Sequence, residues 1–189
     1  SYESGYDFYG HGTFVAYEAA YIIYKLMPNA KIISYRIFDE YGETTTEIFL
    51  ESIDAIKKLK PDIVSISAGA FGNPNDVFSK KIEELTDMGV MVVSAAGNYG
   101  PTSSTILSPA CSPDVFGIGA SDPMMTVDTV LDDIVCTWSS RGPVIGLSEP
   151  KPDIVAPGES IIGPWRNSER VASGTSLSTP LVTGASTIV

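Results

Sequence analysis

The fold of this chain is constrained most strongly by short apolar runs that alternate with segments whose apolar residues recur at helical spacing. Such runs cover 31–38, 63–67 and 90–95, and the second is apolar almost without interruption. A strand that is apolar on both sides is typical of a parallel sheet covered by helices on both faces. Strands that alternate with helices pair in parallel through right-handed crossovers. We therefore expect an α/β fold of three layers, with a mostly parallel central sheet between helices.

The spacing of apolar residues and the capping residues predict where the helices lie. Apolar residues recur at helical spacing over 14–26 and 48–59, and polar or helix-stopping residues flank both segments. A third helix is predicted to end near Met88, with Asn75 or Asp76 as its N-cap. These helices lie between the predicted strands, as crossover connections require.

The second half of the chain predicts further strands, one hairpin and a last helix. Strands are expected over 115–119, 135–138 and 154–156, and a hairpin over 160–172. In open α/β sheets, functional sites form at the carboxyl ends of the strands. The segments that follow the runs 63–67 and 90–95 are therefore candidate site segments.

The overall composition excludes some partners. The chain has 189 residues, which predicts one domain, and its net charge of -11 argues against nucleic acid as a partner. A solvated acidic surface is the simpler interpretation of this charge, and cation binding is the alternative.

No apolar run is long enough to span a bilayer. Cys111 and Cys136 could pair or remain separate buried thiols, and neither has metal-ligand spacing to another Cys or His.

A serine and the single histidine of the chain form a candidate catalytic pair. A serine hydroxyl becomes a useful nucleophile when a neighbouring base takes its proton, and imidazole is the natural base near neutral pH. Ser176 and His11 each lie in a turn that opens an apolar, helix-like run. The start of a helix disfavours imidazolium and leaves backbone N–H groups unpaired. If the two helix starts meet in space, the chain carries a serine hydrolase site.

Several motifs together resemble those of the subtilisin-like serine proteases. Gly174-Thr175-Ser176 followed by Thr179-Pro180 is similar to the nucleophile motif of that family, and His11-Gly12-Thr13 resembles its histidine motif. The segment 94–98 resembles its oxyanion asparagine segment. Weaker matches lie in the same order between these motifs, over 64–69, 139–143 and 152–158. The resemblance therefore covers nearly the whole chain and implies a subtilisin-like fold.

The resemblance implies a role for each matching residue. Ser176 is expected to be the nucleophile, His11 the general base, and Asn98 the side-chain donor to the oxyanion. The walls of the substrate pocket are expected to be Ser67-Ala68-Gly69 and Ala95-Ala96-Gly97, with the 41–43 segment beside the substrate. A polypeptide substrate would bind as an extended strand against exposed backbone edges. The small side chains of these walls favour a bulky apolar substrate residue.

The chain departs from the family pattern at both ends. The catalytic aspartate of the family lies on a strand well before the histidine, whereas His11 is close to the first residue here. Asp7 lacks the strand-then-glycine context of that aspartate and is not assigned to the triad. We therefore expect residues 1–189 to be a partial peptidase domain, truncated at both ends. The aspartate would come from the missing part of the domain or from another chain.

Further expectations follow from the family or compete with it. No metal or cofactor is expected in catalysis, although the family often carries structural calcium, which the acidic residues of 122–133 could ligate. A secreted or cell-surface location is expected by resemblance. A non-catalytic binding or structural protein with the same fold is the main alternative. A nucleotide-binding site at Gly117-Ile118-Gly119 is disfavoured, because the third glycine and the following helix are missing.

Overall fold

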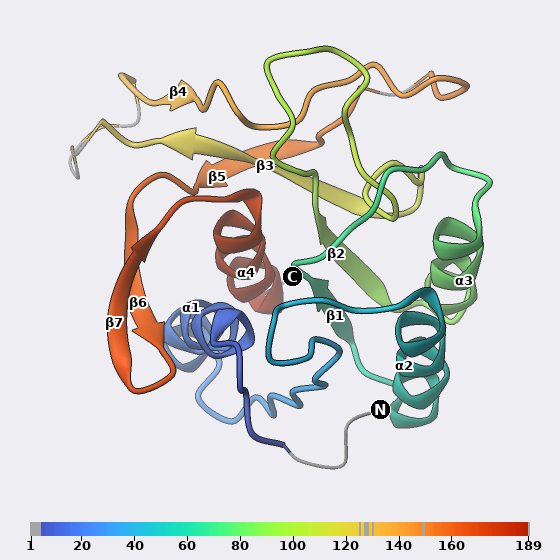
Figure 1. Ribbon diagram of the computed structural model, residues 1–189, viewed down its shortest axis with the longest axis horizontal. Coiled ribbons are helices and arrows are strands. Elements are labelled where there is room, and N and C mark those ends of the chain that lie inside the picture. Colours follow the sequence, from blue (N-terminus) through green and yellow to red (C-terminus); the bar gives the residue numbers. More distant parts are fainter. Residues whose placement is uncertain (1–4, 125, 127–128, 130, 149, 189) are drawn as a thin grey trace.

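The structure is a computed structural model that describes residues 5–124, 126, 129, 131–148 and 150–188. Helix, strand, helix and strand alternate only over 46–95; elsewhere in the described chain, helices or strands also follow one another directly (Figure 1). The helices are α1 (His11–Leu26), α2 (Thr46–Leu59), α3 (Val77–Thr86), α4 (Thr175–Ala185) and the short 3-10 helix η1 (Ser186–Ile188). The strands are β1 (Ile63–Ile66), β2 (Met91–Ala95), β3 (Phe116–Asp122), β4 (Ile134–Val135), β5 (Ile154–Pro157), β6 (Ile161–Trp165) and β7 (Ser168–Ala172).

The central sheet is mostly parallel, as the alternation predicts. β1 pairs with β2, β2 with β3, and β3 with β5, all in parallel. The short β4 is antiparallel to β3. β6 and β7 form a separate antiparallel hairpin, which confirms the hairpin predicted over 160–172.

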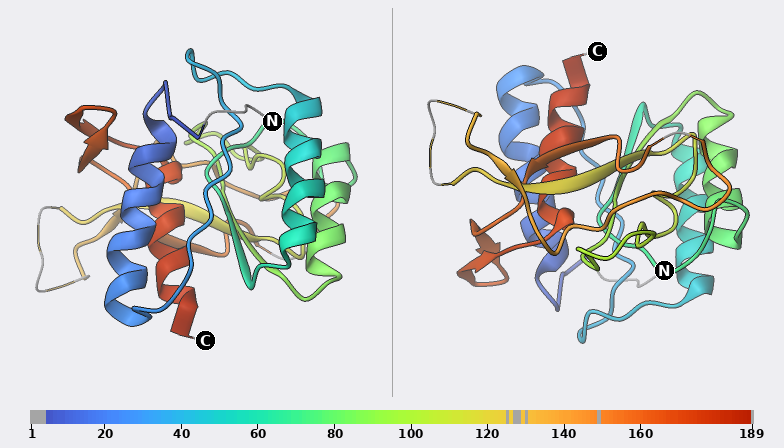
Figure 2. Two further views of the ribbon diagram at one scale, coloured as in Figure 1. Left: turned by 90° about the horizontal axis from the view of Figure 1, so that it is seen from below. Right: turned by 90° about the horizontal axis from the view of Figure 1, so that it is seen from above.

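Helices cover both faces of the sheet, and the residues of β2 show why its sequence is continuously apolar. Val92 packs with α2 and α3, whereas its neighbour Val93 packs with Val182 of α4 on the opposite face. Successive side chains of a strand point to opposite faces, so both faces of β2 are buried. Figure 2 shows α1 and α4 on one side of the sheet and α2 and α3 on the other. The three-layer prediction is confirmed.

Capping side chains define the starts of two helices. The side chain of Thr45 accepts a hydrogen bond from Ile48 N (3.3 Å) at the start of α2. Asp76 Oδ1 accepts from Ser79 N (2.8 Å) at the start of α3, so Asp76 is the N-cap of the third helix. Such side-chain acceptors satisfy backbone donors that the helix leaves unpaired.

Two strand predictions are wrong. The segment 31–38 forms no strand, because β1 pairs only with β2 among the described residues and no ladder reaches this segment. A β-branched sequence becomes a strand only when another strand supplies its hydrogen bonds. The strand expected over 135–138 shortens to Ile134–Val135, because Ser139 N donates to Cys136 O (3.0 Å) and turns the chain.

Two further observations concern the cysteines and the helices. Cys111 and Cys136 are both buried and both free, so the described structure contains two separate thiols and no bond between them. Among the helices of the described residues, none combines the length and apolar character that crossing a bilayer requires.

Candidate active site

The first turns of α1 and α4 lie at the same end of the fold. The two helices run side by side in the same direction (Figure 2, left). They approach so closely that a Cβ added to Gly184 would lie 2.5 Å from the Cβ of Ile22. His11 is the first residue of α1 and Ser176 is the second residue of α4. The fold therefore brings the histidine and serine motifs to one edge of the molecule.

A proline in α4 helps to fix Ser176. In an α-helix the N–H of residue 180 would bond to the carbonyl of residue 176, but Pro180 has no N–H. Ser176 O instead accepts a hydrogen bond from Ser67 Oγ (2.8 Å), at the carboxyl end of β1. In return, Ser176 Oγ donates to Ser67 O (3.3 Å). This reciprocal pair ties the start of α4 to the sheet.

His11 is held by aromatic rings rather than by Ser176. Its ring meets Phe38 edge-on at 5.9 Å and Trp165 at 6.4 Å between ring centroids. Burial lowers the pKa of His11, and the nearby Asp7 carboxylate partly opposes this shift. Among the described residues no hydrogen bond joins His11 to Ser176, because the serine hydroxyl is turned to Ser67 O. The structure thus brings the two motifs together without the predicted contact between their side chains.

Asp7 caps α1 and makes no hydrogen bond to His11. Its Oδ1 accepts from Tyr9 N (3.0 Å) and Gly10 N (2.7 Å), and its Oδ2 accepts from Thr13 N and Thr13 Oγ1 (both 2.7 Å). Partial burial raises the pKa of Asp7, but these hydrogen bonds outweigh it and the net pKa is lowered. This capping role was not apparent from the sequence, because Asp7 lies before Gly10, which occupies the N-cap position of α1.

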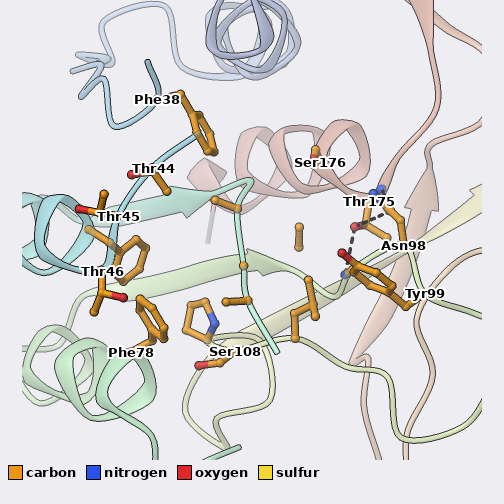
Figure 3. Close-up of a pocket in the computed structure, with 18 residues that line it drawn as sticks. Phe38, Thr44, Thr45, Thr46, Phe78, Asn98, Tyr99, Ser108, Thr175 and Ser176 are labelled. Carbon is orange, nitrogen blue, oxygen red and sulfur yellow. Dashed lines mark hydrogen bonds between the residues drawn. The ribbon is translucent and has the colours of Figure 1, made fainter. Parts of the chain in front are cut away.

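Asn98 is oriented by Thr175. Its Oδ1 accepts hydrogen bonds from Thr175 N (2.9 Å) and Thr175 Oγ1 (3.1 Å), and Thr175 Oγ1 itself accepts from Gly97 N (3.1 Å). A backbone N–H can only donate, so the amide atom that faces it must be the oxygen. The Nδ2 group therefore points away from Thr175, and Figure 3 shows Asn98, Thr175 and Ser176 around one end of a pocket.

Asn98 Nδ2 and Ser176 N converge beside Gly174. A Cβ built on Gly174 would lie 3.5 Å from Asn98 Nδ2 and 3.7 Å from Ser176 N. Both groups are hydrogen-bond donors, and the glycine leaves the space between them open. Two donors that face one open position can hold a negatively charged oxygen.

A cavity of about 430 Å³ adjoins these groups. Four of the six residues predicted to bind substrate line it, namely Ala68, Gly69, Ala95 and Gly97. Ser67 does not line it but bonds to Ser176, and Ala96 is fully buried in the core.

Other lining residues were not identified from the sequence. They are aromatic, apolar or hydroxyl-bearing side chains that include Phe38, Thr44, Thr45, Thr46, Phe49, Phe78, Tyr99, Leu107 and Ser108. Phe49 and Phe78 carry the same periodic signal as core residues, so no pattern separates the two roles. The 41–43 segment, expected to flank the substrate, forms a turn in which Asp39 Oδ1 accepts from Tyr41 N and Glu43 N (both 2.9 Å).

The acidic stretch provides no metal cluster in the part of the chain that is described. No group of three or more His, Cys, Asp or Glu side chains there is arranged to hold an ion. Asp122 Oδ1 accepts from Met124 N (2.8 Å), and Asp132 Oδ1 accepts from Thr126 Oγ1 (3.1 Å). Asp128 lies outside the described residues, so calcium binding stays a prediction.

Comparisons with known proteins found similar sequences among proteases. The chain is 34% identical to the human membrane-bound transcription factor site-1 protease over 97% of its own length and 17% of that protein. It is 32% identical to the serine protease AprX of Bacillus subtilis (strain 168), over 86% of the chain and 42% of AprX. The chain therefore spans less than half the length of these relatives.

The fold also matches a solved structure. A cold-adapted subtilisin-like serine proteinase superposes with a TM-score of 0.77 at 24% identity, over the whole of this chain and 63% of that one. The family model described as the subtilase family matches residues 1–189. This chain belongs to the subtilase family.

Proposed function

We propose that the protein containing this chain is a serine endopeptidase that hydrolyses polypeptides through an acyl-enzyme. Ser176 is the nucleophile, His11 the general base, and Asn98 Nδ2 with Ser176 N the oxyanion donors. The observation that carries this proposal is the convergence of those two donors beside Gly174. Family membership supports it, because the relatives named above are proteases.

The proposed reaction needs one movement of the serine. Ser176 Oγ leaves Ser67 O, gives its proton to the imidazole and attacks the substrate carbonyl carbon. The carbonyl oxygen becomes negative between the two donors, and the leaving amine takes the proton back from the imidazole. Water, deprotonated by the same imidazole, then hydrolyses the ester bond to Ser176. The lowered pKa of His11 suits this role, because a base must be unprotonated when it acts.

An aspartate outside this chain and an extended substrate complete the proposed site. The aspartate that orients His11 lies outside this chain, since Asp7 is occupied by capping. The substrate lies extended along the carboxyl ends of β1 and β2, and a bulky apolar side chain enters the cavity. The cavity walls support this preference, because Ala68, Gly69 and Ala95 leave room and Leu107 supplies an apolar surface.

The chemistry uses only side chains, backbone donors and water, so it calls for no cofactor. Structural calcium in the acidic stretch and a secreted or cell-surface location remain proposals. The name of one relative contains the words membrane-bound transcription factor, which bear on that protein alone.

A fluorophosphonate reagent tests the proposal on the complete protein. The reagent is expected to modify Ser176, and mass spectrometry of the digested protein locates the adduct. Ser176→Ala should abolish both labelling and peptide hydrolysis. Ser186→Ala, at the other end of α4, is the matched control and should retain both. Labelling that persists in Ser176→Ala would contradict the proposal and favour a non-catalytic role for this site.

A further inference from the structure

The segment that follows β4 is bonded to the strand end that carries the proposed oxyanion amide. Ser140 N donates to Gly97 O (3.0 Å), and Ser140 Oγ accepts from Tyr99 N (3.1 Å). Trp138 O accepts from Gly100 N (2.9 Å). These bonds hold the backbone on both sides of the amide donor. A displacement of this segment would therefore displace the amide.

The segment that follows β5 is bonded to the turn that carries the proposed nucleophile. Gly174 N donates to Gly158 O (2.9 Å), and Ser160 N donates to Ser173 Oγ (2.9 Å). Ser173 Oγ in turn donates to Glu159 Oε1 (2.6 Å). The hydroxyl of Ser173 thus donates one hydrogen bond and accepts another, and Ser173 lies directly before Gly174.

One carboxylate joins these two segments. Glu159 Oε1 accepts from Ser173, and its other oxygen, Oε2, accepts from Trp138 Nε1 (2.8 Å). We propose that Glu159 is a positioning residue that, together with the direct hydrogen bonds from Thr175 to Asn98, fixes the distance between Asn98 and the nucleophile turn of Ser176. This inference rests on the proposed function, because it assigns a geometric task to the two sides of the same oxyanion site.

The chemistry of the bridge fits a permanent carboxylate. The hydrogen bonds from Ser173 and Trp138 lower the pKa of Glu159, so the group is ionised at neutral pH. Hydrogen bonds to an ionised acceptor are short and strong, which suits a tie between two loops. The neighbouring Cys136 thiol stays protonated, since burial, with Glu159 adding to it, raises its pKa to about 11.

If Glu159 is a positioning residue, neutralising it should change kcat in the opposite direction from a simple charge effect. A negative charge near the site opposes an oxyanion, so neutralising Glu159 would raise kcat if its charge were what mattered. If Glu159 instead holds the geometry, the same substitution lowers kcat, because small misplacements of reacting groups are costly. The direction of the change in kcat therefore separates the two explanations.

The test measures kcat and KM of the complete protein on a peptide substrate. For Glu159→Ala we expect kcat to fall about ten- to a hundredfold. KM should stay within about twofold, because the loss is confined to the transition state. Glu159→Gln keeps one acceptor and should lose less. Trp138→Phe removes only the indole donor and should lower kcat in the same way.

Controls separate this inference from folding and from the proposed function. Glu169→Gln, an exposed acid on β7, should leave kcat unchanged, and thermal unfolding should be measured for each variant. In an Asn98→Ala background the further effect of Glu159→Ala should shrink, because the amide to be positioned is gone. Unchanged kcat in Glu159→Ala and Trp138→Phe, with Ser176 still labelled by the fluorophosphonate, overturns the bridge alone. Absence of labelling in the wild-type protein overturns the proposed function instead.

Discussion

At the scale of single residues, the site depends on which atoms are already occupied. The side-chain oxygen of Asn98 accepts hydrogen bonds from Thr175, so the side-chain nitrogen of Asn98 faces the open position beside Gly174. The backbone carbonyl of Ser176 accepts a hydrogen bond from Ser67 Oγ, because Pro180 has no N–H to donate to it. The amide nitrogen of Asn98 is thus left for the oxyanion because the oxygen of the same side chain has another partner.

Gly174→Ala should block the oxyanion position without unfolding the protein. The added methyl group would lie 3.5 Å from Asn98 Nδ2 and 3.7 Å from Ser176 N, in the space the oxygen needs. The φ of Gly174 is 165°, an extended value that alanine also adopts, so little backbone strain is expected. We predict that kcat falls about a hundredfold, as for the loss of one oxyanion donor.

Steady-state kinetics and thermal unfolding of Gly174→Ala check this prediction together. A large loss of kcat with an unchanged unfolding temperature is the expected result. Full activity in this variant would show that no oxyanion forms between the two donors.

The sequence identified some of these residues and not others, for a physical reason. His11, Ser176 and Asn98 lie in short motifs that can be recognised from neighbours in the chain. The ties made by Thr175 and Glu159 join residues far apart in sequence. Local patterns carry no information about such pairs, so only the folded structure could reveal them.

At the scale of helices and strands, the site is built from the ends of elements. α1 and α4 begin at the same end, and β1 and β2 finish beside the cavity. The helices could be predicted because spacing and capping act locally. The segment 31–38 could not, because strand formation depends on a partner elsewhere in the chain.

The cap supplied by Asp7 should make the start of α1 sensitive to acid. Because the folded-state pKa of Asp7 lies below its ordinary value of 3.8, ionised Asp7 stabilises the protein above that pH. This contribution is lost as the pH falls through the lowered pKa. Asp7→Asn should cost about 1 kcal/mol of unfolding free energy at neutral pH, because both oxygens of Asp7 accept hydrogen bonds and the NH2 group of Asn cannot.

Denaturant unfolding of the wild type and Asp7→Asn across a range of pH tests whether this stabilisation is lost as the pH falls. The difference between the two proteins should be largest near neutral pH and should shrink below about pH 4. A difference that is constant over this range would mean that the charge of Asp7 contributes nothing to the cap.

The contact between α1 and α4 should tolerate no added volume. A Cβ on Gly184 would lie 2.5 Å from the Cβ of Ile22, so Gly184→Ala must push the helices apart. Overpacking of this kind costs about 1–3 kcal/mol. Because the same helices carry His11 and Ser176, kcat should fall as well.

Ala185→Ser is the matched control, since residue 185 is exposed at the end of α4. It should leave both the unfolding free energy and kcat close to those of the wild type. If Gly184→Ala lowers stability but leaves kcat unchanged, the spacing of the two helices does not set the geometry of the site.

At the scale of the whole molecule, the fold gathers a site from widely separated parts of the chain. The first helix and the last helix cover one face of the sheet, and the cavity lies at the carboxyl ends of β1 and β2. The short apolar runs and the helical spacing between them were enough to predict this architecture and the edge at which the cavity lies. The lining of the cavity required the packing of α2 and α3, which the sequence pattern does not distinguish from core.

The most direct test of the central claim is a crystal structure of the complete protein after reaction with a fluorophosphonate. We predict that phosphorus is bonded to Ser176 Oγ, which has left Ser67 O. One phosphoryl oxygen should lie about 2.7–3.1 Å from both Asn98 Nδ2 and Ser176 N. An adduct on another residue, or an adduct on Ser176 whose oxygens face neither donor, would contradict the account.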